Sequence, residues 1–358
     1  MTTVRSPDVS PGRATPTFEH LPHRHDPASA GPERRTTGVV AAIVTIGWLL
    51  VYAGIRAAVT VIDPDVPLSA VGTDLMLLAG WPGVVVLGVG AAIAVVQAGL
   101  PKPVPGSVRW LLITGGAGLS ATLFVAAALF LLDLVGGVLP GLGIPFHPYG
   151  AALRLGCVVA AGLLAWHTHR FWVATRPAGA GIDPLVATPW WAWVAGYAAA
   201  LGCLVRLGAQ LVVGLDANPL AAGPMMVVFE VGFLLAGLLL PLALVHSWGR
   251  SWPFWVPFLA GRRVPRWLLV ISGGVLGVGM TAYFGIVLGQ MIMERLQGRN
   301  PFPPSGGLTL PEPFFWVSIP AYLIWGVGLM VATVSYHRIT SPAARAATAG
   351  SQSNSTSV

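Results

Sequence analysis

Charge is scarce in this sequence. Charged residues make up 9% of the 358 residues, whereas hydrophobic residues make up 55%. An ordinary soluble domain has about a quarter of its residues charged, so the composition excludes that class. The net charge of +7 does not indicate nucleic acid, because the basic residues are spread over short connections instead of clustering in one domain.

Catalytic signatures are also missing. The sequence contains no Gly-x-Ser-x-Gly, no His-Glu-x-x-His, no phosphate-binding Gly-Lys-Ser/Thr loop and no pair of aspartates within an apolar run. Its two cysteines, Cys157 and Cys203, both lie inside apolar runs, which is typical of small packing residues. These absences favour a protein that is not an enzyme and predict neither a cofactor nor a metal site.

Long apolar runs are what the sequence has in abundance. Each is long enough, at 1.5 Å per helical residue, to cross the ~30 Å hydrocarbon layer of a membrane. We therefore predict an all-α polytopic membrane protein with eight transmembrane helices. The predicted spans are residues 38–62, 73–98, 109–133, 149–167, 190–215, 225–247, 266–291 and 314–337.

The distribution of basic residues predicts how these spans are oriented. Of the 20 Lys and Arg residues, 15 lie in the two tails and in alternate connections, while the opposite connections hold only Arg295 and Arg299. Because basic loops stay in the cytoplasm, we expect a cell-membrane protein with both termini cytoplasmic. Residues 1–37 and 339–358 are rich in Pro, Ser, Thr or Ala and are predicted to be disordered cytoplasmic tails.

One tetrapeptide occurs twice and suggests an internal repeat. Arg109–Leu112 recurs as Arg266–Leu269, 157 positions later, at the start of a long apolar run in each case. Other matches are Gly116–Ala121 with Gly277–Ala282, Leu77–Gly80 with Leu234–Gly237, Pro148-Tyr149 with Pro313-Phe314, and His169-Arg170 with His337-Arg338. The predicted domains are a four-span repeat over 38–170, a cytoplasmic linker over 171–189 and a second four-span repeat over 190–338. An even number of spans per repeat predicts two parallel halves related by rotation about the membrane normal.

Ionisable residues inside the predicted spans need an explanation, because a charge in the hydrocarbon layer is costly. Arg56 and Arg206 lie in the first span of each half, while Asp74 and Glu230 lie near the start of the second span. We therefore expect Arg56 to pair with Asp74 and Arg206 to pair with Glu230 as structural ion pairs. Arg154 has no assigned partner in this scheme.

The surplus of arginine over acid also suggests a ligand. The candidate ligand-binding residues are Arg56, Arg154, Arg206, Gln210 and Glu230, all predicted in the outer half of the layer. The favoured function is transport or handling of an anionic small molecule or lipid on the external side, with membrane lipids as partners. The alternative is a non-catalytic membrane scaffold or accessory subunit, whose charges only hold helices together.

The segment Gly261–Leu268, with the sequence Gly-Arg-Arg-Val-Pro-Arg-Trp-Leu, and the duplicated eight-span layout resemble uncharacterised multi-pass membrane proteins of actinobacteria. The resemblance covers about residues 38–338. It implies a polytopic helical fold. It implies no activity, so no functional residue follows from it.

The predicted topology can be tested by labelling with a membrane-impermeant thiol reagent. A cysteine introduced at Gly306 should react from outside the cell, because the connection around it carries few basic residues. A cysteine at Gly179, in the predicted cytoplasmic linker, should react only after permeabilisation. The reverse pattern would contradict the predicted orientation.

Overall fold

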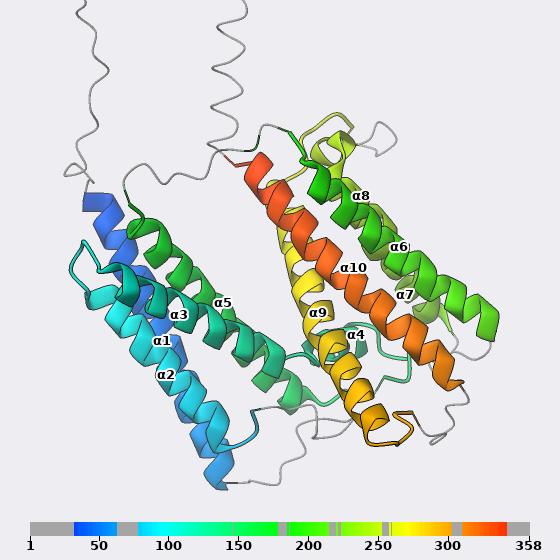
Figure 1. Ribbon diagram of the computed structural model, residues 1–358, viewed down its shortest axis with the longest axis horizontal. Helices are drawn as coiled ribbons and strands as arrows, with labels where there is room; N and C mark the ends of the chain where they lie inside the picture. The colour runs from blue at the N-terminus through cyan, green and yellow to red at the C-terminus, as the bar shows by residue number, and fades with distance from the viewer. Residues whose placement is uncertain are drawn as a thin grey trace, which may run out of the picture. The chain divides into compact units, whose positions relative to one another are not determined.

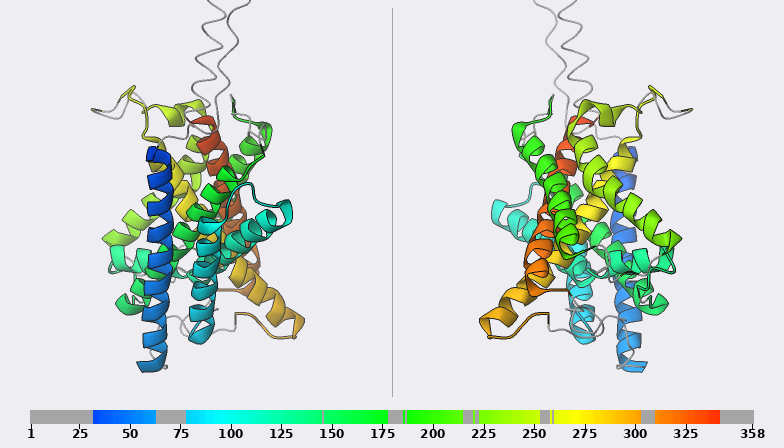
Figure 2. Two further views of the ribbon diagram at one scale, coloured as in Figure 1. Left: turned by 90° about the vertical axis from the view of Figure 1, so that its left-hand side faces the viewer. Right: turned by 90° about the vertical axis from the view of Figure 1, so that its right-hand side faces the viewer.

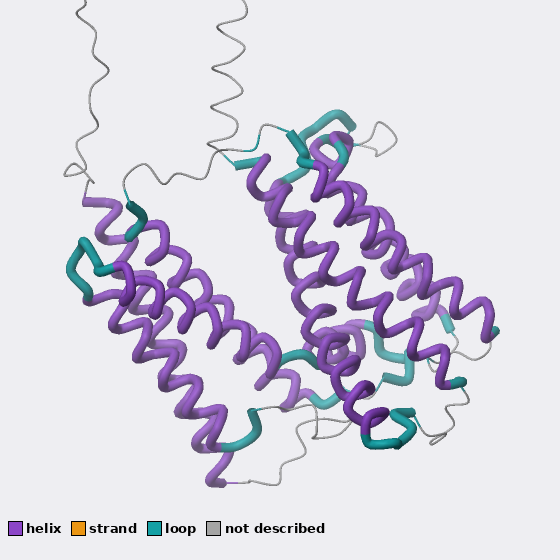
Figure 3. The backbone as a smooth tube through the Cα atoms, in the orientation of Figure 1, coloured by secondary structure: helices purple, strands orange, loops and turns teal. Residues whose placement is uncertain are grey.

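The computed structural model describes residues 32–62, 78–144, 146–177, 185, 187–214, 220, 223–252, 258, 260–302 and 310–341. Within these ranges the regular elements are helices and no strand occurs, which confirms the all-α prediction (Figure 3). The chain divides into a short unit, Met1–Val40, and a main unit, Ala41–Val358. The contacts described below lie within the main unit.

Most of the helices cross the main unit from end to end (Figure 1). The first half contains α1 (Pro32–Ile62), α2 (Trp81–Gly99), α3 (Gly106–Ala126), α4 (Phe130–Val138) and α5 (Pro148–Ala174). The second half contains α6 (Trp190–Val213), α7 (Pro224–Leu234), the π-helix η2 (Leu235–Leu239), α8 (Leu240–Val245), the short 3₁₀-helix η3 (Ser247–Arg250), α9 (Arg266–Leu296) and α10 (Glu312–Ile339).

In the described part of the chain, eight helical segments are long and apolar enough to span a membrane, as predicted. Seven are α1, α2, α3, α5, α6, α9 and α10, and the eighth is the continuous segment Pro224–Val245. The chain therefore has the helices of a multi-pass membrane protein. Figure 2 follows these helices from two further directions.

The third span ends earlier than predicted. The sequence from Val125 to Leu132 is apolar without interruption, so hydropathy predicted one span to residue 133. In the structure α3 ends at Ala126, and the amide of Ala127 contacts the carbonyls of both Leu123 and Phe124. Such shared hydrogen bonds are common where a helix tightens and ends. Asp133 therefore lies on the separate helix α4 instead of closing the third span.

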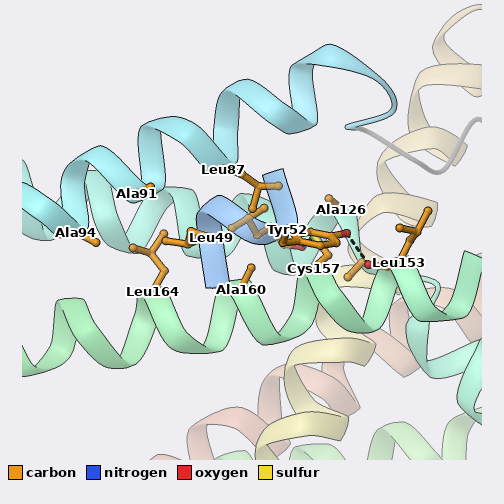
Figure 4. Packing of buried hydrophobic residues seen from close by; sticks show 13 residues of the cluster. Leu49, Tyr52, Leu87, Ala91, Ala94, Ala126, Leu153, Cys157, Ala160 and Leu164 are labelled. Atoms are coloured by element: carbon orange, nitrogen blue, oxygen red, sulfur yellow. Dashed lines mark hydrogen bonds between the residues drawn. The ribbon is translucent and has the colours of Figure 1, made fainter. Parts of the chain in front are cut away.

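The first four spans build one apolar core (Figure 4). Ala160 and Leu164 of α5 are fully buried against α1 and α2, and Leu123 of α3 joins them. Tyr52 of α1 donates its hydroxyl hydrogen to the carbonyl oxygen of Leu153 on α5 at 2.6 Å. This bond satisfies the phenol inside the core, where an unpaired hydroxyl would be costly.

The last four spans build a second core around α10. Trp325, Leu329 and Tyr336 of α10 pack with Cys203 of α6 and Leu244 of α8. The contact between α6 and α10 relies on small residues, because a Cβ at Gly202 would lie 2.5 Å from the carbonyl oxygen of Ala321. Helices in lipid associate through such close backbone approach. Each core is thus made by four consecutive spans.

A π-helical turn interrupts the sixth span. The amide of Leu240 bonds to the carbonyl of Leu235, five residues earlier, and Pro241 follows directly. Proline lacks an amide hydrogen and crowds the preceding turn, which accounts for the irregular helix here. Gly237 lies in this turn, whereas Gly80 precedes the first residue of α2. The sequence match between Leu77–Gly80 and Leu234–Gly237 therefore joins positions that differ in structure.

Basic residues gather at one end of the main unit. Arg109 at the start of α3 bonds to Thr175 at the end of α5, and Arg266 at the start of α9 contacts His337 near the end of α10. We call this the basic end. The described Lys and Arg residues there are Lys102, Arg109, Arg170, Arg176, Arg250, Arg262, Arg263, Arg266 and Arg338.

The acidic residues described between Ala41 and Ser341 all lie toward the opposite end; they are Asp133, Glu230, Glu294 and Glu312. There Arg299 donates from Nη2 to Oε1 of Glu294 at 2.9 Å. This hydrogen bond raises the pKa of Arg299 above its usual value. The described acidic residues are therefore confined to one end of the main unit, where arginines accompany them.

Close helix contact at Gly202 can be tested by adding side-chain volume. Gly202→Val should destabilise the protein by at least about 1–3 kcal/mol, since the new atoms would meet the backbone of Ala321. Thermal unfolding in detergent, followed by size-exclusion fluorescence, should show a lower melting temperature. Gly208→Val is the matched control, because a Cβ at Gly208 on the same helix meets nothing within 4 Å. Equal losses would show that helix propensity, not packing, causes the effect.

Candidate functional site

Arg154 has a carboxylate partner that the sequence did not assign. Its Nη1 donates to Oδ2 of Asp133, and the side chains are only 2% and 11% exposed. The turn after α3 makes this possible, because it directs α4 back against the start of α5. A buried charge pair of this kind is costly to break, since removing one partner leaves the other charge alone in an apolar surrounding.

Arg56 is buried without a described carboxylate partner. It is 6% exposed, and its Nη2 donates to the carbonyl oxygen of Leu78 at 2.6 Å. Gly83 makes room for it, because a Cβ there would lie 3.0 Å from Nη2. Asp74 lies outside the described residues, so the pairing of Arg56 with Asp74 stays a prediction.

Arg206 has different partners from the predicted one. Its Nε donates to the hydroxyl oxygen of Tyr322 at 3.0 Å, and its Nη2 donates to Oε1 of Gln210 at 3.0 Å. The guanidinium also lies 4.9 Å from the ring centroid of Phe314 and 5.6 Å from that of Tyr322. Cation–π contacts and neutral acceptors therefore surround this charge.

Glu230 does not join Arg206. It is exposed on α7, and no ion pair connects these two residues in the part of the chain that the structure describes. The predicted Arg206–Glu230 pair is therefore replaced by the Tyr322 and Gln210 contacts. The physical reason is that Glu230 lies on an exposed face of α7, whereas Phe233 of the same helix packs against Tyr322 and Trp325. Of the candidate ligand residues, only Arg206 and Gln210 contact each other.

A cleft lies between the two halves of the main unit. It has a volume of about 700 Å³ and is lined by α3 and α5 from the first half and by α9 and α10 from the second. Its walls are mostly apolar; the lining residues with polar groups are Ser120, Thr168, His169, Trp172 and Thr281. Sequence reasoning missed this cleft, because an apolar side chain facing a cleft looks the same in a sequence as one facing lipid.

The basic end of the cleft carries cations from both halves. Arg176 lies 3.6 Å above the ring of Trp172, and the ring of His169 lies 5.5 Å from that of Trp172. On the other side, Arg266 Nη2 lies 2.9 Å from Nδ1 of His337 and donates to the His337 carbonyl at 3.2 Å. His169 and His337 are close enough to interact electrostatically. No carboxylate forms an ion pair with these cations among the residues described.

A second, smaller cavity of about 480 Å³ lies within the second half, between the π-helical turn, α8 and α9. Leu235, Ala236 and Leu239 of the π-helix line it. Elsewhere, His167 of α5 is buried and contacts the carbonyl oxygen of Ala94 at 3.2 Å. In the described part of the chain, no group of three His, Cys, Asp or Glu residues is arranged to hold a metal ion.

Comparison of the chain with protein-family models, with curated proteins and with solved structures finds no match. The resemblance based on Gly261–Leu268 therefore stays a prediction.

The Arg154–Asp133 pair can be tested by a double-mutant cycle. Arg154→Leu or Asp133→Leu alone should cost about 3–5 kcal/mol, because each leaves a lone charge in a buried position. The double variant should lose less than the sum of the two. The measurement is the fraction folded in an SDS titration. Arg299→Leu with Glu294→Leu is the control, since that pair is exposed and should show little coupling because water screens it. Additive losses for the first pair would rule out the buried interaction.

Proposed function

We propose that the two halves are parallel repeats related by a pseudo-twofold axis along the membrane normal. The first support is a matched contact between the first and fourth helices of each half. A Cβ at Gly156 would lie 2.5 Å from Tyr52, and a Cβ at Gly202 would lie 2.5 Å from Ala321. Gly202 follows Tyr52 by 150 positions and Ala321 follows Gly156 by 165, which are the offsets of Arg56 to Arg206 and of Pro148 to Pro313.

The third and fourth helices of each half supply a second matched contact. A Cβ at Gly116 would lie 2.3 Å from Oγ1 of Thr168, and a Cβ at Gly273 would lie 2.3 Å from Oγ1 of Thr333. The glycines are 157 positions apart and the threonines 165. The offset of 157 is that of the recurring Arg-Trp-Leu-Leu. It supports a repeat in which Gly116 corresponds to Gly273. The match of Gly116–Ala121 with Gly277–Ala282 would shift this alignment by about one helical turn.

The ends of the fourth helices follow the same register. The amide of Thr175 bonds to the carbonyl of Phe171 and that of Thr340 to Tyr336, each at 3.0 Å. Both pairs of equivalent residues are 165 positions apart. The proposed alignment therefore keeps this offset to the end of the helix and drops the match of His169-Arg170 with His337-Arg338.

The second helices of the two halves align with a smaller offset than the 157 positions between Leu77–Gly80 and Leu234–Gly237. Pro82 and Pro224 lie at the starts of α2 and α7. Each begins the pattern Pro-x-x-Val-Val-(Leu or Phe)-x-Val-Gly, 142 positions apart. The offset falls from 150 between Arg56 and Arg206 to 142 here, because the connection before the second helix is shorter in the second half. Glu230 then corresponds to Gly88, and an acid on the second helix is not a repeated feature.

In this proposal the cleft lies on the axis between the halves. Four equivalent pairs line it: Ala121 and Val278, Phe124 and Thr281, and Val125 and Ala282, each 157 positions apart, and Ala165 and Met330, 165 apart. The two third helices, α3 and α9, also contact each other directly. Ligand sites of transporters with repeats often lie at the repeat interface.

We infer that the protein handles a membrane lipid, with an acyl chain of the lipid in this cleft. The observation that carries the proposal is the apolar lining of a cleft of about 700 Å³ that opens among eight apolar spans. Pockets that bury small ligands measure about 300–1,000 Å³. In this proposal the basic end faces the cytoplasm of a cell-membrane protein, because loops rich in Lys and Arg are retained there.

A membrane scaffold or accessory subunit is the second candidate. It is favoured by the internal partners of the three arginines within spans. Arg154 has Asp133, Arg206 has Tyr322 and Gln210, and Arg56 has the Leu78 carbonyl. These contacts reduce the support for an external anionic site built from the three arginines. Under the lipid proposal, the arginine contacts stabilise the fold around the cleft, and the apolar cleft itself binds the lipid.

The lipid proposal can be tested by filling the cleft. Ala121→Trp with Ala282→Trp should lower photocrosslinking to a phospholipid with an acyl-chain diazirine by roughly ten-fold, or about 1.4 kcal/mol of affinity. Cross-linked peptides from α3 and α9 in the parent protein would be identified by mass spectrometry.

Thr122→Trp is the matched control, since Thr122 is exposed on α3 but does not line the cleft. It should leave the labelling of α3 and α9 unchanged. If the cleft-filled variant is folded and labelled as strongly as the parent, the lipid proposal is wrong and the scaffold alternative gains support.

A further inference from the structure

We propose that the basic end of the cleft binds the phosphate-bearing headgroup of an anionic lipid. This inference rests on the lipid-handling function proposed above and adds the chemical class of the lipid. The headgroup would lie among Arg176, His169, Arg266 and His337, while its acyl chain extends into the apolar cleft. The geometry, the charge balance and the position along the membrane normal support it.

The first half supplies a guanidinium held in place by an aromatic ring. Arg176 lies two residues after the last residue of α5, and its guanidinium carbon is 3.6 Å from the ring centroid of Trp172. Trp172 and His169 both line the cleft. Stacking holds the planar guanidinium by one face and leaves its edge of N–H donors free to bind oxygen. Arg176 is therefore oriented at the mouth of the cleft by a residue of the cleft wall.

The second half supplies a guanidinium held by a histidine. Nη2 of Arg266 lies 2.9 Å and 3.1 Å from the two ring nitrogens of His337 and 3.2 Å from its carbonyl oxygen. These contacts use a single nitrogen of the guanidinium. The fork formed by the other nitrogens suits the oxygens of a phosphate. Because His337 and His169 interact electrostatically, the cations of the two halves face one shared region.

Among the residues described between Ala41 and Ser341, no acidic side chain lies at the basic end beside Arg176 and Arg266. The three ion-pairing acids and the exposed Glu230 lie toward the opposite end, so they do not neutralise these cations. Phosphate oxygens bind arginine through charge-assisted hydrogen bonds, and basic pockets between spans on the cytoplasmic side bind anionic lipid headgroups.

The apolar cleft selects a lipid over a soluble anion. The same residues that approach the cations, His169 and Trp172, continue into a wall made of Ala165, Ala121 and Val278. A free phosphate would fill only the charged mouth. An anionic phospholipid fills both parts, with its headgroup at the level where arginine and tryptophan gather at a membrane surface.

The test compares two lipids that differ only in headgroup. Purified full-length protein in a neutral detergent would be titrated with phosphatidylglycerol or phosphatidylcholine of identical acyl chains, and bound lipid would be counted by native mass spectrometry. The parent protein should bind phosphatidylglycerol roughly ten-fold more tightly, as two charge-assisted contacts predict. Arg176→Gln and Arg266→Gln, singly and together, should remove this preference by weakening phosphatidylglycerol binding much more than phosphatidylcholine binding.

Arg262→Gln is the matched control, because Arg262 is an exposed arginine at the same end and, among the described contacts, its side chain touches neither Trp172 nor His337. Loss of the phosphatidylglycerol preference to the same degree in Arg262→Gln would overturn the assignment. Persistence of the preference in the folded Arg176→Gln and Arg266→Gln variants would overturn it as well. If inorganic phosphate at lipid-equivalent concentration abolishes phosphatidylglycerol binding, the site takes a soluble anion and the inference is wrong.

The cleft-filling variant separates this inference from the function beneath it. Ala121→Trp with Ala282→Trp should weaken the binding of both lipids equally, since it occupies the space of the acyl chain. Unchanged binding of both lipids in that variant would contradict the lipid-handling function. If the cleft-filled variant loses both lipids but the arginine variants keep the headgroup preference, only the headgroup site is contradicted.

Discussion

Close approach of helix backbones at glycine is the interaction on which the rest of this structure depends. Lipid is as apolar as a leucine side chain, so helices in a membrane gain little from hydrophobic association and rely on packing. Gly156 and Gly116 bring α1 and α3 against α5, and Gly202 and Gly273 bring α6 and α9 against α10. The fourth helix of each half is thereby the axis around which its core forms.

Tight packing in turn determines how each buried charge is stabilised. Three arginines within spans have three different surroundings: a carboxylate for Arg154, a backbone carbonyl for Arg56, and aromatic rings with a neutral amide for Arg206. In each case the guanidinium has acceptors or ring faces within the protein, as an apolar environment requires. These side chains stabilise the two cores, which places the candidate ligand chemistry elsewhere.

The interface between the halves is packed less completely than either core. Leu131 of α4 fits against Gly279 of α9, and α3 contacts α9, yet a cleft of about 700 Å³ stays between them. Its apolar walls and its basic end together form an amphipathic site. An amphiphile of matching polarity, with a chain and an anionic headgroup, satisfies both parts at once.

The sequence by itself determined the number of spans, the all-helical class and the asymmetry of basic residues, because hydropathy and charge are local properties of each segment. It could not determine which helix faces meet. Asp133 pairs with Arg154 only because an unbroken apolar run stops being helical at Ala127, and Glu230 misses Arg206 because it lies on an exposed face of α7. The cleft likewise depends on how two cores come together. An apolar side chain has the same hydropathy whether it faces a core, a lipid or a cavity, so only the tertiary structure decides among them.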